Sequence, residues 1–185
     1  TALNGTWLKG PGKAFFDAIE SDLGKLNVVA EDLGIITSEV ERLRDDCGFP
    51  GMKIVHFMLE PNESGRVGFT TPENSIVYTG THDNNTTVGW FTRDIDEVLR
   101  ESLANLVGTT SDRPRTICQR LIKAAYASRA RMAIIPMQDI LGLDERARMN
   151  TPGTVGLNWR WCLKKDYLLE IDPQKLKALC VRYRR

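Results

Sequence analysis

Short apolar runs recur along the chain, and the segments between them carry apolar residues at helical spacing. Four runs occupy residues 27–30, 54–59, 76–78 and 132–137, and Gly, Pro, Asn or Thr residues bound them. Their short length and their β-branched or aromatic content predict strands that are buried on both faces, as in a parallel sheet.

Four segments of helical spacing accompany these runs. Thr37 and the Asp172-Pro173 pair stand where helix N-termini are expected. Strands that alternate with helices predict βαβ units, so the fold class is α/β. The four apolar stripes consist of Val40, Leu43 and Cys47; of Leu99, Leu103, Leu106 and Val107; of Ile117, Leu121, Ile122 and Ala125; and of Leu176, Leu179, Cys180 and Tyr183.

Length limits the architectures that this pattern allows. The chain has 185 residues, the size of one domain, whereas a complete (β/α)₈ barrel needs roughly 250. Four strands therefore form either a small doubly wound sheet or half of a barrel. No Gly-x-Gly-x-x-Gly or P-loop pattern follows a predicted strand, which disfavours the nucleotide-binding versions of the fold.

Composition narrows the class of partner. Lys and Arg number 25 against 24 Asp and Glu, a net charge of +1, which argues against a nucleic-acid surface driven by bulk charge. No apolar run reaches the roughly 18–20 residues of a membrane span, and no signal peptide is visible. The four cysteines form no Cys-x-x-Cys pair, so a reduced, cytoplasmic protein without a zinc ribbon is the simplest interpretation.

Polar residues follow three of the predicted strands. Glu31 and Asp32 come directly after the first, residues 82–85 (His-Asp-Asn-Asn) after the third, and residues 138–139 (Gln-Asp) at the end of the fourth. In parallel α/β folds, side chains at the carboxyl ends of strands face the ligand crevice. Carboxylates at neighbouring strand ends suit glycosidic-bond chemistry, in which one acts as acid/base and another as nucleophile or stabiliser.

A structural explanation competes with the functional one more strongly for some candidates than for others. Glu31 and Asp32 stand where helix N-caps and loop residues are common. A polar cluster such as His82 and Asp83 costs desolvation free energy without helping a core, which favours a functional role. One His and one Asp are too few ligands to predict a zinc site.

Other polar and aromatic residues are expected to serve the core. Asp139 is expected to be structural, and His56, inside an apolar run, is expected to be a satisfied core histidine. Trp159 and Trp161 would point the same way on an extended segment and would then suit stacking on sugar rings, although packing is the commoner use. The Trp90-Phe91 pair is likewise expected to pack.

Several motifs together resemble a known family. They are VAEDLG at 29–34, PGM at 50–52 and YTGTHDNNTT at 78–87, with further matches at GPGK (10–13), QD (138–139) and MNTPG (149–153). In their order and spacing the chain is similar to the 4-α-glucanotransferases (amylomaltases, or disproportionating enzymes) of the wider α-amylase-like clan. The resemblance covers nearly the whole chain.

The resemblance implies a fold and a set of roles. Residues 1–185 would be a single partial domain, the second half of a (β/α)₈ TIM barrel with its last four strands and C-terminal helices. Glu31 would be the general acid/base and Asp83 the carboxylate that stabilises the transition state. His82 would bind sugar hydroxyls, and Asn150 would lie near the bound glucan.

The resemblance also implies partners and an incomplete site. The substrate would be an α-1,4-glucan or maltooligosaccharide of starch or glycogen metabolism, with no metal or organic cofactor, no nucleic acid and no membrane. The family's nucleophilic Asp lies on the fourth strand, upstream of Thr1, so the missing N-terminal half of the barrel would be a partner and this chain alone is expected to be inactive. Two departures concern substrate detail: residues 61–74 lack a Leu-Pro-His sequence, and Asn85 stands where Asp is frequent.

Three alternatives remain open at this point. The chain could be a glucan-binding or vestigial half-barrel that catalyses nothing, or one subunit of a split barrel that a separate chain completes. It could also be an unrelated four-stranded α/β domain with no sugar site.

Overall fold

The computed structural model describes residues 4–6, 8–59, 70–107 and 113–185. The chain divides into two compact units, Thr1–Met52 and Lys53–Arg185, and each is described by itself. Residues 61–74, which lack the Leu-Pro-His sequence, fall mostly outside the described residues. That residues 1–185 form a single partial domain stays a prediction.

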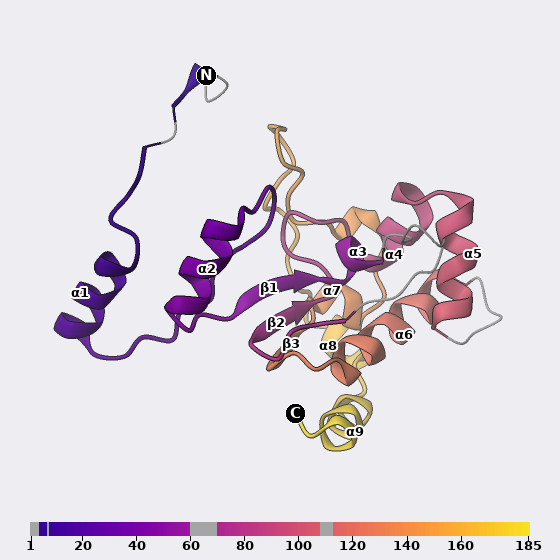
Figure 1. Ribbon diagram of the computed structural model, residues 1–185. Helices are drawn as coiled ribbons and strands as arrows, with labels where there is room; N and C mark the ends of the chain where they lie inside the picture. Colours follow the sequence, from indigo (N-terminus) through magenta and orange to yellow (C-terminus); the bar gives the residue numbers. More distant parts are fainter. Residues whose placement is uncertain (1–3, 7, 60–69, 108–112) are drawn as a thin grey trace. The chain divides into compact units, whose positions relative to one another are not determined.

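The described part of the N-terminal unit contains two helices, which Figure 1 labels. These are α1 (Lys13–Leu23) and α2 (Ser38–Asp46), and the second confirms the helix predicted after Thr37. The strand predicted at 27–30 is wrong in extent. Only Ala30 pairs, in one parallel bridge to Gly51, where the Ala30 N–H donates to the Pro50 carbonyl at 2.9 Å; directly afterwards the chain turns, as the Asp32 N–H donates to the Ala30 carbonyl at 3.0 Å.

The sheet has three strands among the described residues, in the order β1 (Gly51–Ile54), β2 (Ser75–Tyr78) and β3 (Met132–Ile134). Strands β2 and β3 pair in parallel, which confirms the predicted type of sheet. Burial on both faces is confirmed for β2 but is wrong for β3. Met132 and Ile134 of β3 are 50% and 39% exposed, because they point to the face opposite Ala133, which packs against the core.

Two predicted strands end earlier than the apolar pattern suggests. The run at 54–59 was expected to be one strand, but β1 ends at Ile54 and the rest forms α3 (Val55–Met58). The run at 132–137 leaves the sheet after Ile134, and α7 (Met137–Ile140) begins directly after Pro136. Proline has no N–H to donate to a strand ladder, so pairing stops before it.

The remaining helices follow the predicted stripes. The helix α6 (Pro114–Ala127) buries its predicted stripe completely, and the N-cap Asp96 of α5 accepts a hydrogen bond from the Leu99 N–H. Asp172 caps α9 in the same way, through the N–H groups of Gln174 and Lys175. The other elements are α4 (Thr87–Gly89), which continues into the π-helix η2 (Trp90–Asp94), α5 (Glu97–Leu106), η3 (Glu145–Ala147), α8 (Tyr167–Glu170) and α9 (Pro173–Tyr183).

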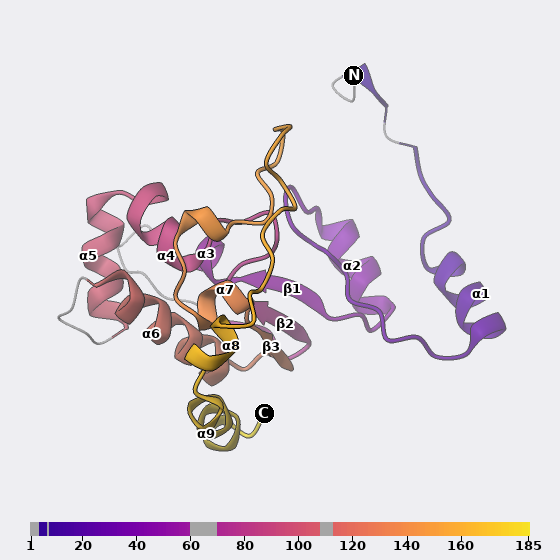
Figure 2. The same ribbon diagram turned by 180° about the vertical axis from the view of Figure 1, so that it is seen from behind.

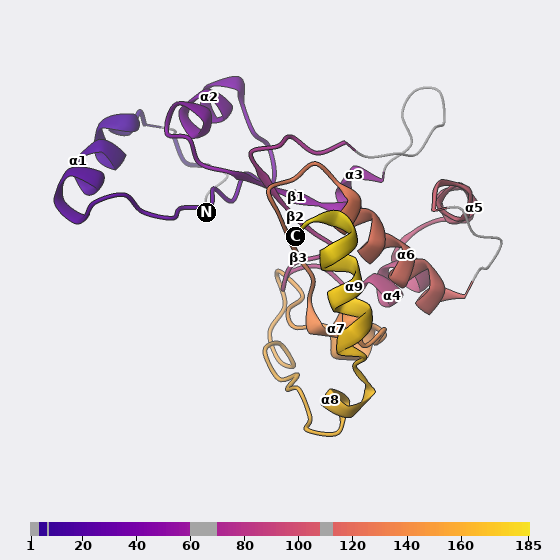
Figure 3. The same ribbon diagram turned by 90° about the horizontal axis from the view of Figure 1, so that it is seen from below.

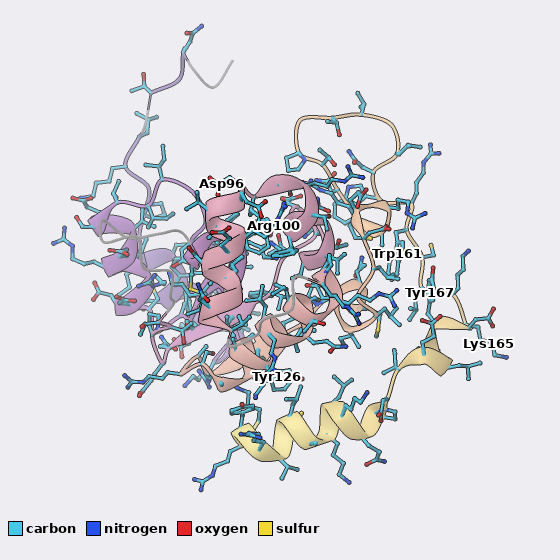
Figure 4. The ribbon with its side chains drawn as sticks, turned by 90° about the vertical axis from the view of Figure 1, so that its right-hand side faces the viewer. Asp96, Arg100, Tyr126, Trp161, Lys165 and Tyr167 are labelled. Atoms are coloured by element: carbon cyan, nitrogen blue, oxygen red, sulfur yellow. The ribbon has the colours of Figure 1, made fainter. Side chains whose placement is uncertain are left out.

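The main core of the C-terminal unit lies between the sheet, η2, α5 and α6. Trp90 and Phe91 belong to it, which confirms their expected packing role. The guanidinium of Arg100, which Figure 4 labels, lies 5.4 Å from the centre of the Phe91 ring. The helix α9 packs along α6 (Figure 3), where the Arg185 guanidinium donates to the carbonyl oxygens of Tyr126, Ser128 and Ala130 at 2.6–2.7 Å. The buried cluster consists of Val55, Leu59, Val77, Trp90, Phe91, Leu103, Ile117, Leu121, Ala125 and Ala130.

Candidate functional site

A tight turn presents two of the predicted site residues at the carboxyl end of β2. Asn84 Oδ1 accepts from both the N–H and the hydroxyl of Thr81, each at 2.8 Å, and the Asn84 N–H donates to the Thr81 carbonyl at 3.2 Å. The Asp83 N–H reaches the Thr81 hydroxyl at 3.3 Å. These local bonds satisfy the backbone of the turn and leave His82 and Asp83 at its tip.

A second segment, residues 148–159, binds this turn (orange in Figure 2). Asn150 Nδ2 donates to Asp83 Oδ1 at 2.6 Å, and the Asn150 N–H donates to the His82 carbonyl at 3.0 Å. The Arg148 guanidinium donates to the backbone carbonyls of Asp83 and Asn150, both at 2.7 Å. The structure therefore brings together His82, Asp83 and Asn150, three of the four predicted site residues.

The side chains of His82 and Asp83 remain open to solvent. The side chains of His82 and Asp83 are 51% and 43% exposed, and His82 Nε2 lies 3.4 Å from Asp83 Oδ1. An amide donor on one carboxylate oxygen fixes the orientation of Asp83 while the group stays accessible to a ligand. A carboxylate held this way suits hydrogen bonding to hydroxyl groups and stabilisation of positive charge.

Trp159 extends the cluster with an aromatic face. Its ring lies 5.0 Å from the His82 ring, centre to centre, and Trp159 is 58% exposed. The residue has a positive φ of 62°, and its N–H donates to the Met149 carbonyl at 2.7 Å. The extended segment assumed for Trp159 and Trp161 is therefore absent at Trp159, and Trp161 is half-buried.

Asp139 lies beneath the turn and is buried, with 2% of its surface exposed. Its carboxylate accepts from the Thr79 hydroxyl at 2.5 Å and from the N–H and hydroxyl of Thr87, both at 2.7 Å. Burial raises the pKa of Asp139, and the three hydrogen bonds act in the opposite direction. The expectation that Asp139 serves the structure is confirmed.

His56 is the second buried titratable group below the turn. Its Nε2 lies 3.1 Å from Thr87 Oγ1, and its ring stacks on Trp90 with centres 4.4 Å apart and an angle of 5° between the planes. Burial lowers the pKa of His56 to about 3. The imidazole is therefore neutral at physiological pH, which confirms its expected role as a satisfied core histidine.

The N-terminal unit separates the two adjacent carboxylates of its predicted strand end. The Asp32 side chain is 4% exposed, pairs with the Arg44 guanidinium at 2.5 Å and accepts from the Met52 N–H at 2.7 Å. Gly51 lies so close to it that an added Cβ would stand 2.5 Å from Asp32 Oδ2. Glu31, the next residue back along the chain, is exposed. Asp32 thus joins α2 to the start of β1 in this unit, and Glu31 is the carboxylate that faces solvent.

Arg148 is a site residue that the sequence reasoning missed. It is partly buried and joins the two segments that carry the predicted residues, through the carbonyls of Asp83 and Asn150. Its position directly before the Met149-Asn150 pair was the available signal. Within the described residues, no group of three or more His, Cys, Asp or Glu side chains is placed to hold a metal ion.

Comparison with known proteins identifies the family. The sequence profile of the 4-alpha-glucanotransferases matches residues 1–168. The chain belongs to the 4-alpha-glucanotransferase family. This confirms the resemblance that the motifs carry, and it excludes the alternative of an unrelated α/β domain.

Individual relatives agree with this assignment. The chain is 45% identical to the 4-alpha-glucanotransferase of Streptococcus pneumoniae serotype 4 over 186 residues, and 40% identical to the chloroplastic/amyloplastic 4-alpha-glucanotransferase of Solanum tuberosum over 189 residues. Both matches span 100% of this chain, but only 36% and 32% of those proteins. The chain therefore spans about a third of the length of the curated relatives it matches.

The fold agrees with a solved member of the family. The amylomaltase from Streptococcus agalactiae in complex with acarbose is 35% identical and superimposes with a TM-score of 0.87, over 100% of this chain and 37% of that one. In the part of this chain that the structure describes, no helix is both long and apolar enough to cross a membrane.

Proposed function

We propose that this chain is the part of a 4-alpha-glucanotransferase that carries the acid/base and the transition-state carboxylate. The whole enzyme transfers a segment of one α-1,4-glucan or maltooligosaccharide to another and retains the anomeric configuration. The family membership supports the reaction class. The cluster of His82, Asp83, Asn150 and Trp159 is the observation that carries the assignment to a glucan site, because it joins hydroxyl-binding groups to an aromatic face.

Glu31 supplies the proton chemistry in this proposal. In the first step it protonates the glycosidic oxygen of the leaving sugar while a second carboxylate attacks the anomeric carbon and forms a glycosyl-enzyme ester. In the second step the ionised Glu31 takes the proton of the incoming hydroxyl, whose oxygen displaces the ester. The exposed side chain of Glu31, beside the buried Asp32, supports this assignment.

The attacking carboxylate belongs to the part of the enzyme that this chain does not span. By resemblance to the family, it is an Asp on the fourth barrel strand, upstream of Thr1. The parallel β2–β3 pair and the parallel bridge at Ala30 support a place for this chain in the second half of a (β/α)₈ barrel, which the N-terminal half completes. A cytoplasmic location stays a prediction from cysteine usage.

Asp83 acts on the charge of the transition state. The reacting sugar develops positive charge at the anomeric carbon in both steps, and a fixed carboxylate beside it lowers that energy. Asn150 holds Asp83 Oδ1 at 2.6 Å, so the group needs little reorganisation as charge develops. His82 and Trp159 bind the hydroxyls and the face of a sugar ring. The carboxylates perform all proton and charge transfer, so the reaction needs no metal or organic cofactor.

Activated donors distinguish the two carboxylate roles in the complete enzyme. Glu31→Gln is expected to abolish transfer from maltotriose, whose leaving group needs a proton, but to allow reaction of an α-maltosyl fluoride, whose leaving group does not. Asp83→Asn is expected to slow both donors by a similar factor. Glu41→Gln, an exposed carboxylate on α2, is the matched control and should leave both rates unchanged.

Each outcome decides a different part of the proposal. Equal loss on both donors for Glu31→Gln, or selective rescue for Asp83→Asn, would reverse the two assignments. The chain on its own should show no disproportionation of maltotriose by chromatography. Activity of the chain alone would refute the need for an upstream nucleophile, and binding without activity in the complete protein would favour a glucan-binding or vestigial module.

A further inference from the structure

Asp139 holds both ends of the segment that carries Asp83. Residues 79–87 leave β2 at Thr79 and enter α4 at Thr87, and one carboxylate accepts hydrogen bonds from both of these residues. Asp139 belongs to α7, the short helix that follows the neighbouring strand β3, and it lies 60 positions from Thr79 and 52 from Thr87 in sequence. The carboxylate therefore fixes the distance between the two ends of the segment.

We propose that Asp139 is a positioning residue for the glucanotransferase reaction, because its carboxylate holds the base of the 79–87 segment and so sets where the Asp83 carboxylate stands. This inference rests on the proposed function of Asp83. Asp139 does not touch the glucan in this arrangement. It acts through the two ends of the segment, while Asn150 and Arg148 hold Asp83 itself.

The environment of Asp139 is more elaborate than packing alone requires. A buried carboxylate costs desolvation free energy, and an apolar residue of similar volume is commonly as stable at such a position. Charge-assisted hydrogen bonds are shorter and stronger than neutral ones, so the three contacts define the segment more tightly than an apolar residue would. The Cys118 thiol also lies 3.3 Å from the Asp139 carbonyl oxygen, which places the backbone of the residue itself.

The hydrogen-bond directions extend this support into the core. Thr87 has one hydroxyl proton, which it donates to Asp139 Oδ2, so its oxygen accepts from His56 Nε2 at 3.1 Å. His56 in turn is held by its stack on Trp90. A continuous series of contacts therefore runs from the packed core through Thr87 to Asp139. These contacts hold the end of the segment that enters α4 in place.

Loss of the hydrogen bonds to Asp139 should lower the rate of the transfer reaction. A displacement of about 1 Å in a group that acts on the transition state lowers the rate by up to about 10²-fold. Because Asp83 acts more strongly on the transition state than on the bound substrate, the loss should appear in kcat, with KM for maltotriose changed by less than about twofold.

The test is made in the complete, active enzyme with two pairs of variants. Thr79→Val removes the hydroxyl that bonds to Asp139 and keeps the shape, and it should lower kcat about tenfold. Thr79→Ser keeps the hydroxyl and should restore kcat to within about twofold of the wild type. Asp139→Asn should lower kcat at least as much as Thr79→Val. The control Ser75→Ala removes a buried hydrogen bond, to the Pro72 carbonyl at 2.6 Å, at the opposite end of β2 and should leave kcat unchanged.

A double-mutant cycle with Asp83→Asn separates positioning from general structural support. If Asp139 acts through Asp83, Asp139→Asn should lower the rate with maltosyl fluoride much less in the Asp83→Asn background than in the wild type. Equal factors in both backgrounds would overturn the inference, as would a fall in Tm without any change in kcat. If Asp139→Asn does not fold, the same cycle with Thr79→Val decides. Absence of transfer by the wild-type enzyme would refute the proposed function instead.

Discussion

The buried imidazole of His56 makes a quantitative prediction about stability and pH. Its pKa is about 3 in the folded chain and near 6.5 when it is exposed to water. The unfolded chain therefore binds a proton first as the pH falls. The contribution of neutral His56 is fully present above pH 6.5 and is lost as the pH falls toward 3. At about 1.4 kcal/mol per pH unit, the loss is about 2 kcal/mol at pH 5 and about 4 kcal/mol at pH 3, where the folded chain also begins to bind the proton.

One other buried group beside His56 titrates in part of the same range. Burial raises the pKa of Asp139 above its usual value, so its contribution to stability has the opposite sign and increases as the pH falls through the carboxylate range. The His56 effect is therefore measured as a difference between the wild type and His56→Gln. The glutamine keeps an N–H donor for Thr87 and does not titrate.

The assay is urea unfolding at a series of pH values, followed by tryptophan fluorescence. The free energy of unfolding should fall by about 2 kcal/mol less between pH 7.5 and pH 5 in His56→Gln than in the wild type. His82, the second of the two histidines in the chain, is exposed, so the change in slope for His56→Gln is compared with that for His82→Gln as the matched control. Equal slopes for the wild type and His56→Gln, or an NMR titration of His56 near pH 6.5, would refute the reasoning.

Three substitutions and one property of the whole chain give further predictions. Asn85→Asp places a carboxylate where Asn85 Nδ2 now donates to Asp94 at 3.2 Å, so urea unfolding should show a loss of about 1–2 kcal/mol at pH 7.5 that is recovered near pH 4. Gly89→Ala brings a Cβ to 2.8 Å from Asn85 Cγ and should lower the free energy of unfolding by about 1–3 kcal/mol in the same assay. Asp172→Ala removes the N-cap of α9 and should cost about 1 kcal/mol, whereas Asp172→Asn should cost less than half of that. The chain alone should associate as its concentration rises in sedimentation experiments, because β3 is an edge strand with exposed apolar side chains, and a concentration-independent monomer would contradict this.

The sequence by itself determined the elements whose signals are local. The α6 stripe repeats at the period of a helix, so the face that the helix buries follows from spacing alone. Asp172 and Pro173 are similarly sufficient to place the start of α9, since the cap acts within one turn. The family and the candidate residues His82, Asp83 and Asn150 came from motifs, which require no knowledge of contacts.

Only the tertiary structure decided where the strands end and what each polar residue contacts. Apart from His56, the run at 54–59 is apolar, and apolar content alone does not distinguish a buried strand from a strand followed by a buried helical turn. The contact from Asn150 to Asp83 spans 67 positions, and that from Asp139 to Thr79 spans 60. Such pairings depend on which strands lie side by side, because hydrogen-bond partners are chosen by distance in space and not by separation along the chain.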